Sequence, residues 1–211
     1  MNQMQNIFGV PLFIKKLDCD GQDIKIRKGI KSINKKLYAL VKKLEKKEKH
    51  LKTEFSNLGG FHSKPLLKNK LAEEFVKFIQ PMVYDNLRLF HFKNDIQVTF
   101  EEPWFIINRK GHENHMHTHS GSDFSIVFYV KAPKNCGDIT FYQNSYINHG
   151  CSYFNFEMTA QHALNSMSWK VTPEESMMVM FPSYLQHSVK ENLSNEERIS
   201  FALNIKLKEI K

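Results

Sequence analysis

The segment RISFALNIKL, residues 198–207, has two chemically different faces when it is drawn as an extended strand. Side chains alternate between the two faces of a strand, so one face is wholly apolar: Ile199, Phe201, Leu203, Ile205 and Leu207. The other face carries Arg198, Ser200, Ala202 and Asn204. A guanidinium and a hydroxyl on one face can bind a carboxylate together, because arginine presents a planar fork of donors. The segment therefore predicts either a strand with a buried anion site or an edge strand with Arg198 in water.

The same period of two recurs through the second half of the chain. We expect six more strands, which read IQVTF (96–100), WFIIN (104–108), FSIVFYV (124–130), ITFY (139–142), SWKV (168–171) and MMVMF (177–181). Turn residues separate these segments, which are rich in β-branched and aromatic side chains. Trp104 and Trp169 fall within them, so we expect both indoles in the core.

Helical periodicity dominates the first half of the chain. Residues 30–50 form one apolar stripe with Ile30, Ile33, Leu37, Val41 and Leu44. Residues 67–90 repeat the pattern, with Pro81 expected to kink or divide the helix, and FSNLGGFHSKP (55–65) is expected to be a loop. Helices followed by many short strands indicate a single α+β domain over residues 1–211. Residues 1–93 would be mainly helical support, and residues 94–211 an antiparallel barrel or sandwich.

The composition limits the classes of protein that the chain can represent. Its 211 residues carry a net charge of +8, much of it in KKLYALVKKLEKKEKHLK (35–52), which is typical of the solvated face of a helix. A polyanion-binding face is the alternative. The cysteines, Cys19, Cys136 and Cys151, indicate free thiols in a reducing compartment. We find neither a run long enough to span a membrane nor a secretory signal, so we expect a cytoplasmic protein.

The stretch HENHMHTHSG, residues 112–121, holds four of the ten histidines. On an extended strand, His115, His117 and His119 would project to one side, whereas on a helix residues two apart diverge. An H-x-H pair at a strand end can give two nitrogens to one metal ion, and a third ligand must then come from elsewhere in the chain. His187 in FPSYLQHSV is the candidate for that ligand, and a surface-loop histidine is the alternative.

Taken together, these segments resemble the double-stranded β-helix oxygenases that use Fe(II) and 2-oxoglutarate. That family carries H-x-D/E, then a distal histidine, then an arginine or lysine that is often part of R-x-S. In this chain HTH (117–119), His187 and RIS (198–200) stand in that order. The likeness is greatest to a prolyl-hydroxylase-like branch found in marine bacteria and phages. Motifs of that branch are matched by SNLGGFHS, WFIIN, HTHSGSDFSIVFYV, FPSYLQHSV and RISFALN.

The resemblance implies a jelly-roll or cupin-like barrel supported by the N-terminal helices, with Fe(II) bound by His117, His119 and His187. It also implies that Arg198, Ser200 and Tyr129 bind the far carboxylate of 2-oxoglutarate. A packed core tyrosine is the alternative for Tyr129. Asn108 and Ser125 are further candidates for the pocket wall, although Asn108 could instead only satisfy a strand end.

The chain departs from the family pattern at His119, which replaces the acidic ligand of H-x-D. Three neutral imidazoles give the iron one negative charge fewer than two imidazoles and a carboxylate. Asp123 is the alternative third ligand if its loop bends inward, water is another, and His115 could displace one of the three histidines. Imidazole also binds zinc, nickel and copper, so the sequence does not fix the ion. His112, His149 and His162 are expected at the surface.

The implied activity is hydroxylation of a C–H bond in a peptide, an amino acid or another small substrate, with release of succinate and carbon dioxide. The partners are then 2-oxoglutarate, dioxygen and an unidentified primary substrate. A nucleic acid is not favoured, no membrane partner is expected, and a homodimer is compatible with the sequence. Two other functions stay open: a cupin-like metal-binding protein without oxygenase activity, and a basic nucleic-acid-binding module built on the lysine-rich helix.

Overall fold

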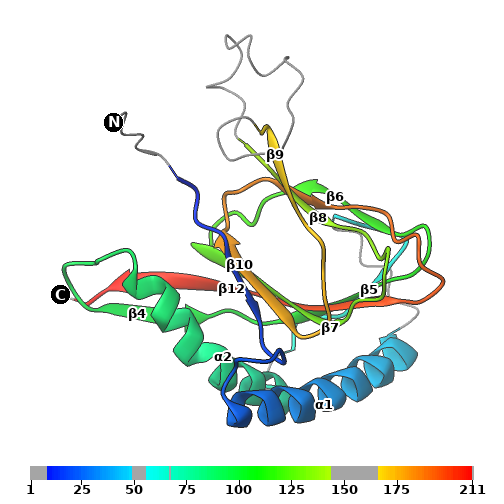
Figure 1. The fold of residues 1–211 in the computed structure, drawn as a ribbon, viewed down its shortest axis with the longest axis horizontal. Helices are drawn as coiled ribbons and strands as arrows, with labels where there is room; N and C mark the ends of the chain where they lie inside the picture. Colours follow the sequence, from blue (N-terminus) through cyan, green and yellow to red (C-terminus); the bar gives the residue numbers. More distant parts are fainter. Residues whose placement is uncertain (1–8, 49–55, 67, 144–165, 211) are drawn as a thin grey trace.

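Two antiparallel sheets and two helices make up the described part of the chain in the computed structural model, which covers residues 9–48, 56–66, 68–143 and 166–210 (Figure 1). The larger sheet has the order β1 (Phe13–Lys16), β10 (Met177–Pro182), β7 (Phe124–Lys131), β12 (Arg198–Glu209), β5 (Trp104–Asn108) and β3 (Phe61–His62), and β4 (Ile96–Phe100) pairs with the far end of β12. The smaller sheet has the order β2 (Asn57–Leu58), β6 (Glu113–His117), β11 (His187–Val189), β8 (Ile139–Tyr142) and β9 (Ser168–Val171). The predicted α+β class is confirmed.

Strand β12 organises the larger sheet. It pairs with β7 on one side and with β5 and then β4 on the other. Ile199, Phe201, Leu203 and Ile205 are completely buried in the main hydrophobic core. The face with Arg198 and Ser200 lines a cavity instead. The alternative of an exposed edge strand is therefore wrong.

The two helices pack on the core face of the larger sheet (Figure 1). Helix α1 (Ile24–Glu48) buries the predicted stripe from Ile30 to Val41, and helix α2 (Lys70–Arg88) begins at Asn69, whose side chain accepts from the backbone N–H groups of Leu71 and Ala72. Such a cap satisfies two donors that a helix start leaves free. Pro81 lies inside α2 without dividing it, so one of the two expected effects of this proline is absent.

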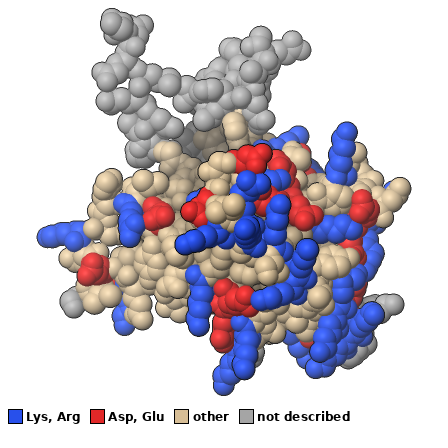
Figure 2. Space-filling view, turned by 60° about the horizontal axis from the view of Figure 1, so that its bottom comes forward, with Lys and Arg blue, Asp and Glu red and all other residues tan. Residues whose placement is uncertain are grey.

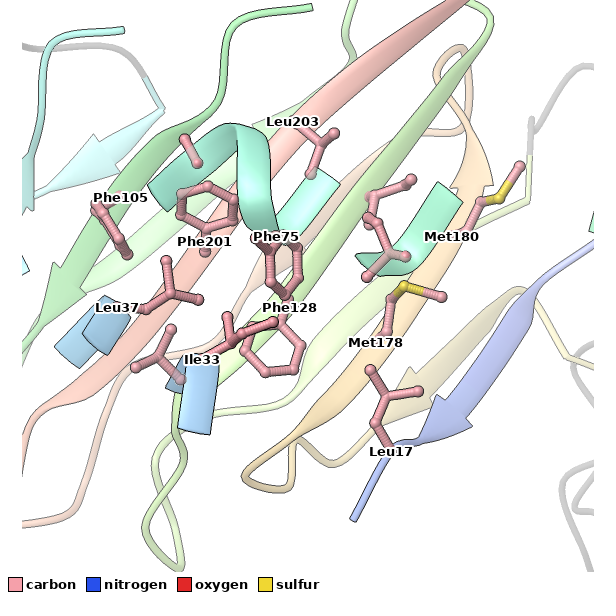
Figure 3. Packing of buried hydrophobic residues seen from close by; sticks show 14 of the residues in the cluster. Leu17, Ile33, Leu37, Phe75, Phe105, Phe128, Met178, Met180, Phe201 and Leu203 are labelled. Carbon is pink, nitrogen blue, oxygen red and sulfur yellow. The ribbon is translucent and has the colours of Figure 1, made fainter. Parts of the chain in front are cut away.

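The core between the helices and the sheet is rich in aromatic rings (Figure 3). The ring centroid of Phe75 on α2 lies 4.8 Å from that of Phe128 on β7 and 5.1 Å from that of Phe201 on β12. Phe105 on β5 approaches Phe201 at 4.7 Å. Because these rings join α2 to the three central strands, this packing fixes the helices against the sheet whose other face forms the cavity.

Several expectations from the sequence need correction. The segment 55–65 contains the short strands β2 and β3, which join different sheets, and β1 also precedes residue 94. The described residues within 1–93 therefore contribute three short strands to the sheets in addition to the two helices. Neither tryptophan lies in the core: Trp169 is 43% exposed and Trp104 is half-buried on the cavity wall.

The lysines of α1 lie mostly on the solvent side of the helix. Figure 2 shows basic side chains, interspersed with acidic ones, across the side of the molecule that the helices form. Residues 49–52 of the lysine-rich segment lie outside the described residues. Neither described helix is long and apolar enough to cross a membrane.

We predict that Phe75→Ala lowers the free energy of unfolding by about 3–5 kcal/mol, because it leaves a cavity between Phe128 and Phe201. Chemical denaturation measures this loss. The matched control is Phe92→Ala, since Phe92 is 45% exposed, and it should cost about 1 kcal/mol or less. Equal losses in the two variants would contradict this account of the core.

Candidate metal centre and co-substrate cavity

Three histidines converge on one point between the sheets. His117 ends β6 and lies directly opposite His187, the first residue of β11. Side chains of directly opposed residues lie on the same face of a sheet, and the two ring centroids are 4.2 Å apart. His119 follows β6, where its backbone N–H donates to the carbonyl oxygen of Ser183 at 2.9 Å. One nitrogen from each of the three rings lies within 4.8 Å of the other two.

Backbone carbonyls orient two of the three rings. Nδ1 of His117 lies 2.7 Å from the oxygen of His115, and Nδ1 of His187 lies 2.9 Å from the oxygen of Leu185. A carbonyl oxygen only accepts, so each Nδ1 carries a hydrogen and each Nε2 keeps a lone pair. This is how metal-binding histidines are commonly held.

Burial keeps the three imidazoles neutral at physiological pH. Burial, with a smaller contribution from His117, lowers the pKa of His187 to about 3 and that of His119 to about 4. Burial also lowers the pKa of His117. The rings of Phe181 and Phe141, at centroid distances of 4.7 and 6.0 Å from His187, make up part of this apolar surrounding. A neutral imidazole is the form that binds a metal ion.

His115 and Asp123 do not join this cluster. In the pairing of β6 with β11, the register shifts between His117 and Asn114, so a bulge breaks the alternation of side chains. Asn114 turns to the cavity and His115 to solvent, near Glu113. The carboxylate of Asp123 accepts from the backbone N–H of Leu207 at 2.7 Å. The expectation that His115 shares the face of His117 is therefore wrong, and the alternative in which Asp123 turns inward is not adopted in the described residues.

The histidine cluster lines a cavity of about 590 Å³ that also contains the sequence-predicted anion site. Arg198, Ser200, Tyr129 and Ser125 all line it. Ser200 lies opposite Tyr129 across the pairing of β12 with β7, so the two side chains share one face. Arg198 is only 3% exposed, and no described carboxylate forms an ion pair with it. Because a buried charge needs compensation, this arginine is suited to an anionic ligand.

Besides the uncompensated charge of Arg198, the cavity wall holds an unsatisfied hydroxyl group, that of Tyr129. It is buried and has no hydrogen-bond partner among the described residues. Burial raises the pKa of Tyr129, so the phenol keeps its proton. An unsatisfied buried donor is costly unless a ligand accepts from it. The cavity thus combines three neutral imidazoles with the Arg198 guanidinium and the Tyr129 hydroxyl group. The imidazoles fit a metal ion, and the guanidinium and hydroxyl fit an anionic oxo acid beside it.

Other side chains around the cavity were not predicted from the sequence, or were predicted differently. Asn108 is wholly buried behind Arg198 and is not on the cavity wall. Asn114 and Asn204 line the cavity, as does Trp104, whose ring stacks on His62 at 6.0 Å. The signal for Asn204 was its place in RISFALN, on the face of Arg198. His112 is partly buried, whereas His149, His162 and Cys151 lie outside the described residues.

Comparisons with known proteins agree with this site. The model of a family described as "Putative 2OG-Fe(II) oxygenase" matches residues 102–204, which include the three histidines and Arg198. A Pseudomonas putida prolyl-4-hydroxylase has a similar structure (TM-score 0.60, 12% identity, 93% of this chain and 92% of that chain covered). No curated protein matches the sequence.

Two further structures share the fold. One is a Trichoplax adhaerens prolyl hydroxylase in complex with a hypoxia-inducible-factor peptide fragment (TM-score 0.58, 13% identity, 92% and 83% covered). The other is HygX from Streptomyces hygroscopicus with nickel, 2-oxoglutarate and hygromycin B bound (TM-score 0.57, 10% identity, 93% and 83% covered). Residues 102–204, which include every residue proposed for the metal and co-substrate site, thus match the family of 2-oxoglutarate- and Fe(II)-dependent oxygenases, and the chain shares the double-stranded β-helix fold of the two prolyl hydroxylases.

Proposed function

We propose that the chain is a 2-oxoglutarate-dependent dioxygenase that hydroxylates a C–H bond of a peptide, an amino acid or another small substrate. One observation carries the proposal: a single cavity holds three convergent imidazoles, a buried guanidinium and a phenol that has no hydrogen-bond partner in the described part of the chain. Substrate R–H, 2-oxoglutarate and dioxygen would give R–OH, succinate and carbon dioxide. One oxygen atom enters the substrate and the other enters succinate.

In this proposal His117, His119 and His187 hold Fe(II) through one nitrogen each. Iron with its bound co-substrate supplies the oxidising chemistry, and the protein supplies binding and orientation. All three ligands are neutral, so the charge of the ion is compensated only by what binds to it. A dianionic co-substrate is therefore favoured over a neutral one. The carbonyl oxygens of His115 and Leu185 fix the rings of His117 and His187 before the metal arrives.

Arg198, Tyr129 and Ser200 are the proposed binding groups for the far carboxylate of 2-oxoglutarate. Arginine offers a planar set of donors to a carboxylate, and the phenol and hydroxyl add one donor each. Arg198 and Tyr129 are almost completely buried. Water competes weakly there, so charge-assisted hydrogen bonds should be strong.

The remainder of the cavity would hold the primary substrate. A volume of about 590 Å³ lies within the range of small-molecule sites, roughly 300–1,000 Å³. The cavity wall includes the half-buried ring of Trp104, which lies 5.9 Å from that of His119. A C–H group of a small molecule or of a peptide side chain that packs on this indole would lie near the metal ligands.

The metal and co-substrate sites are tested together by anaerobic addition of Fe(II) and then 2-oxoglutarate. We expect a weak visible metal-to-ligand charge-transfer band, and uncoupled succinate formation when oxygen is admitted. His187→Ala should abolish the band because it removes one of three ligands. His115→Ala is the control, because this neighbouring imidazole is exposed and outside the cluster. Metal binding without succinate formation would favour a metal-binding protein that has no oxygenase activity.

Replacement of Arg198 by alanine separates co-substrate binding from metal binding. We expect Arg198→Ala to weaken 2-oxoglutarate binding by roughly 10- to 100-fold, the loss of a charged hydrogen bond, while Fe(II) binding is largely kept. Calorimetric titration of both ligands measures the two effects. Arg109→Ala is the control, since Arg109 follows β5 at the surface and pairs with Glu45 and Glu197. Equal loss of metal and co-substrate in Arg198→Ala would indicate a structural arginine.

Tyr129→Phe should have opposite effects on the empty and the loaded protein. Removal of a buried hydroxyl that has no partner among the residues described should leave the ligand-free protein unchanged or more stable by about 1 kcal/mol. The same change removes a donor to 2-oxoglutarate, so the stabilisation that the co-substrate adds should shrink. Thermal denaturation with and without 2-oxoglutarate measures both. A variant that is less stable without ligand would show that the hydroxyl has a partner within the protein.

A further inference from the structure

Arg198 is held in place by neutral oxygen atoms in the described part of the chain. Its Nη1 donates to the carbonyl oxygens of Cys136 at 2.6 Å and Gly137 at 3.1 Å, with that of Lys190 at 3.5 Å. Gly137 is required for this approach, because a Cβ there would lie 2.0 Å from the oxygen of Lys190 and 2.9 Å from Nη1. The arginine is thus positioned without being neutralised.

The second nitrogen of the guanidinium, Nη2, is held by Asn108. The pairing of β12 with β5 sets Arg198 directly opposite Asn108. A guanidinium has only donors, so the atom of the Asn108 amide that lies 2.5 Å from Nη2 is its oxygen. The amide nitrogen of Asn108 then donates to Oδ1 of Asn57 at 2.8 Å. The Asn108 oxygen also lies 2.8 Å from the Asn114 amide, whose nitrogen donates to it when that amide is turned in the same sense. The oxygen of Asn108 is therefore held toward Arg198.

The paired glycines of SNLGGFHS allow this arrangement. A Cβ on Gly60 would lie 2.4 Å from the Asn108 side chain and 2.6 Å from that of Asn57. Only glycine lets the loop between β2 and β3 come this close to the two amides. The motifs SNLGG and WFIIN, from different parts of the sequence, thus meet behind the anion site.

We propose that Asn108 is a positioning residue, which orients the Arg198 guanidinium while leaving its positive charge uncompensated for the anionic end of 2-oxoglutarate. The inference rests on the proposed co-substrate role of Arg198. An aspartate would hold the guanidinium as well or better, but its charge would cancel the attraction for the co-substrate. An amide supplies an acceptor of the same shape without that charge. Because Arg198 also has no acidic partner among the described residues, its positive charge remains available to the co-substrate.

Asn108→Asp tests this inference, because it changes charge with little change in shape. Nδ2 of Asn57 is buried and has no partner within the described ranges, so rotation of that amide would offer a donor to the second carboxylate oxygen. We expect the melting temperature without ligand to be unchanged or higher. The dissociation constant for 2-oxoglutarate, measured by calorimetry on the anaerobic Fe(II)-loaded protein, should rise by about tenfold or more. Fe(II) affinity should stay as in the wild type.

Asn34→Asp is the matched control for a buried amide that becomes a carboxylate. Asn34 lies on α1, and its side chain donates to the carbonyl oxygen of Val130 at 3.0 Å, on the helix side of the sheet. This variant should lose thermal stability and keep the wild-type affinity for 2-oxoglutarate. A role of Asn108 in folding alone would make Asn108→Asp behave in the same way.

Three outcomes of the titration are distinct. Weaker 2-oxoglutarate binding by Asn108→Asp at an unchanged or higher melting temperature supports the inference. Wild-type affinity in Asn108→Asp, or a loss of affinity that accompanies an equal loss of stability and metal binding, overturns it. A wild-type protein that takes up Fe(II) but not 2-oxoglutarate contradicts the proposed function itself, and this result is read before any variant is compared.

Discussion

The pairing of β12 with both β5 and β7 is the constraint on which the rest of the structure depends. It fixes one face of β12 against the aromatic core under the helices and the other face against the cavity. A slip of one residue would exchange these faces, placing Arg198 in the apolar core and Phe201 in the cavity. The cost of burying a charge in the apolar core makes that register strongly unfavourable. The same register of β12 therefore both packs the core and places the site residues in the cavity.

The site retains an uncompensated charge and an unsatisfied hydroxyl group that a purely structural core would avoid. Arg198 and the hydroxyl group of Tyr129 lie in the same cavity, and neither has a charged partner among the described residues. Burial also holds the neighbouring imidazoles in their neutral form. The uncompensated charge and the hydroxyl without a partner cost stability in the empty protein, and binding of the proposed anionic oxo acid beside the metal ion would offset that cost. The packing of Phe75 against β7 and β12 supplies stability on the opposite face of the same sheet.

Local pattern was sufficient for most elements of the fold. The alternation of apolar and polar residues predicted the strands β4, β5, β7, β8, β9, β10 and β12. The apolar stripes predicted both helices. The order of HTH, His187 and RIS, read as a resemblance, led to the family. The pattern was misleading where neighbours decide the outcome. Trp104 and Trp169 have the spacing of core residues, yet one lines the cavity and the other is 43% exposed. The strands β2 and β3 have two residues each, which is too few to show an alternation of apolar and polar side chains.

The sequence by itself determined which residue types could make a site: an H-x-H pair, a distal histidine, and an arginine and serine on one strand face. Only the tertiary structure decided which of them meet. The bulge in β6 turns His115 toward solvent and Asn114 toward the cavity. The carboxylate of Asp123 accepts a hydrogen bond from the backbone N–H of Leu207 on β12 instead of facing the histidines. The same holds for the contact of Gly60 with Asn57 and Asn108. Register shifts and contacts between distant segments depend on how whole strands pair. The spacing of residues along one strand does not determine which strand pairs with it, or in which register.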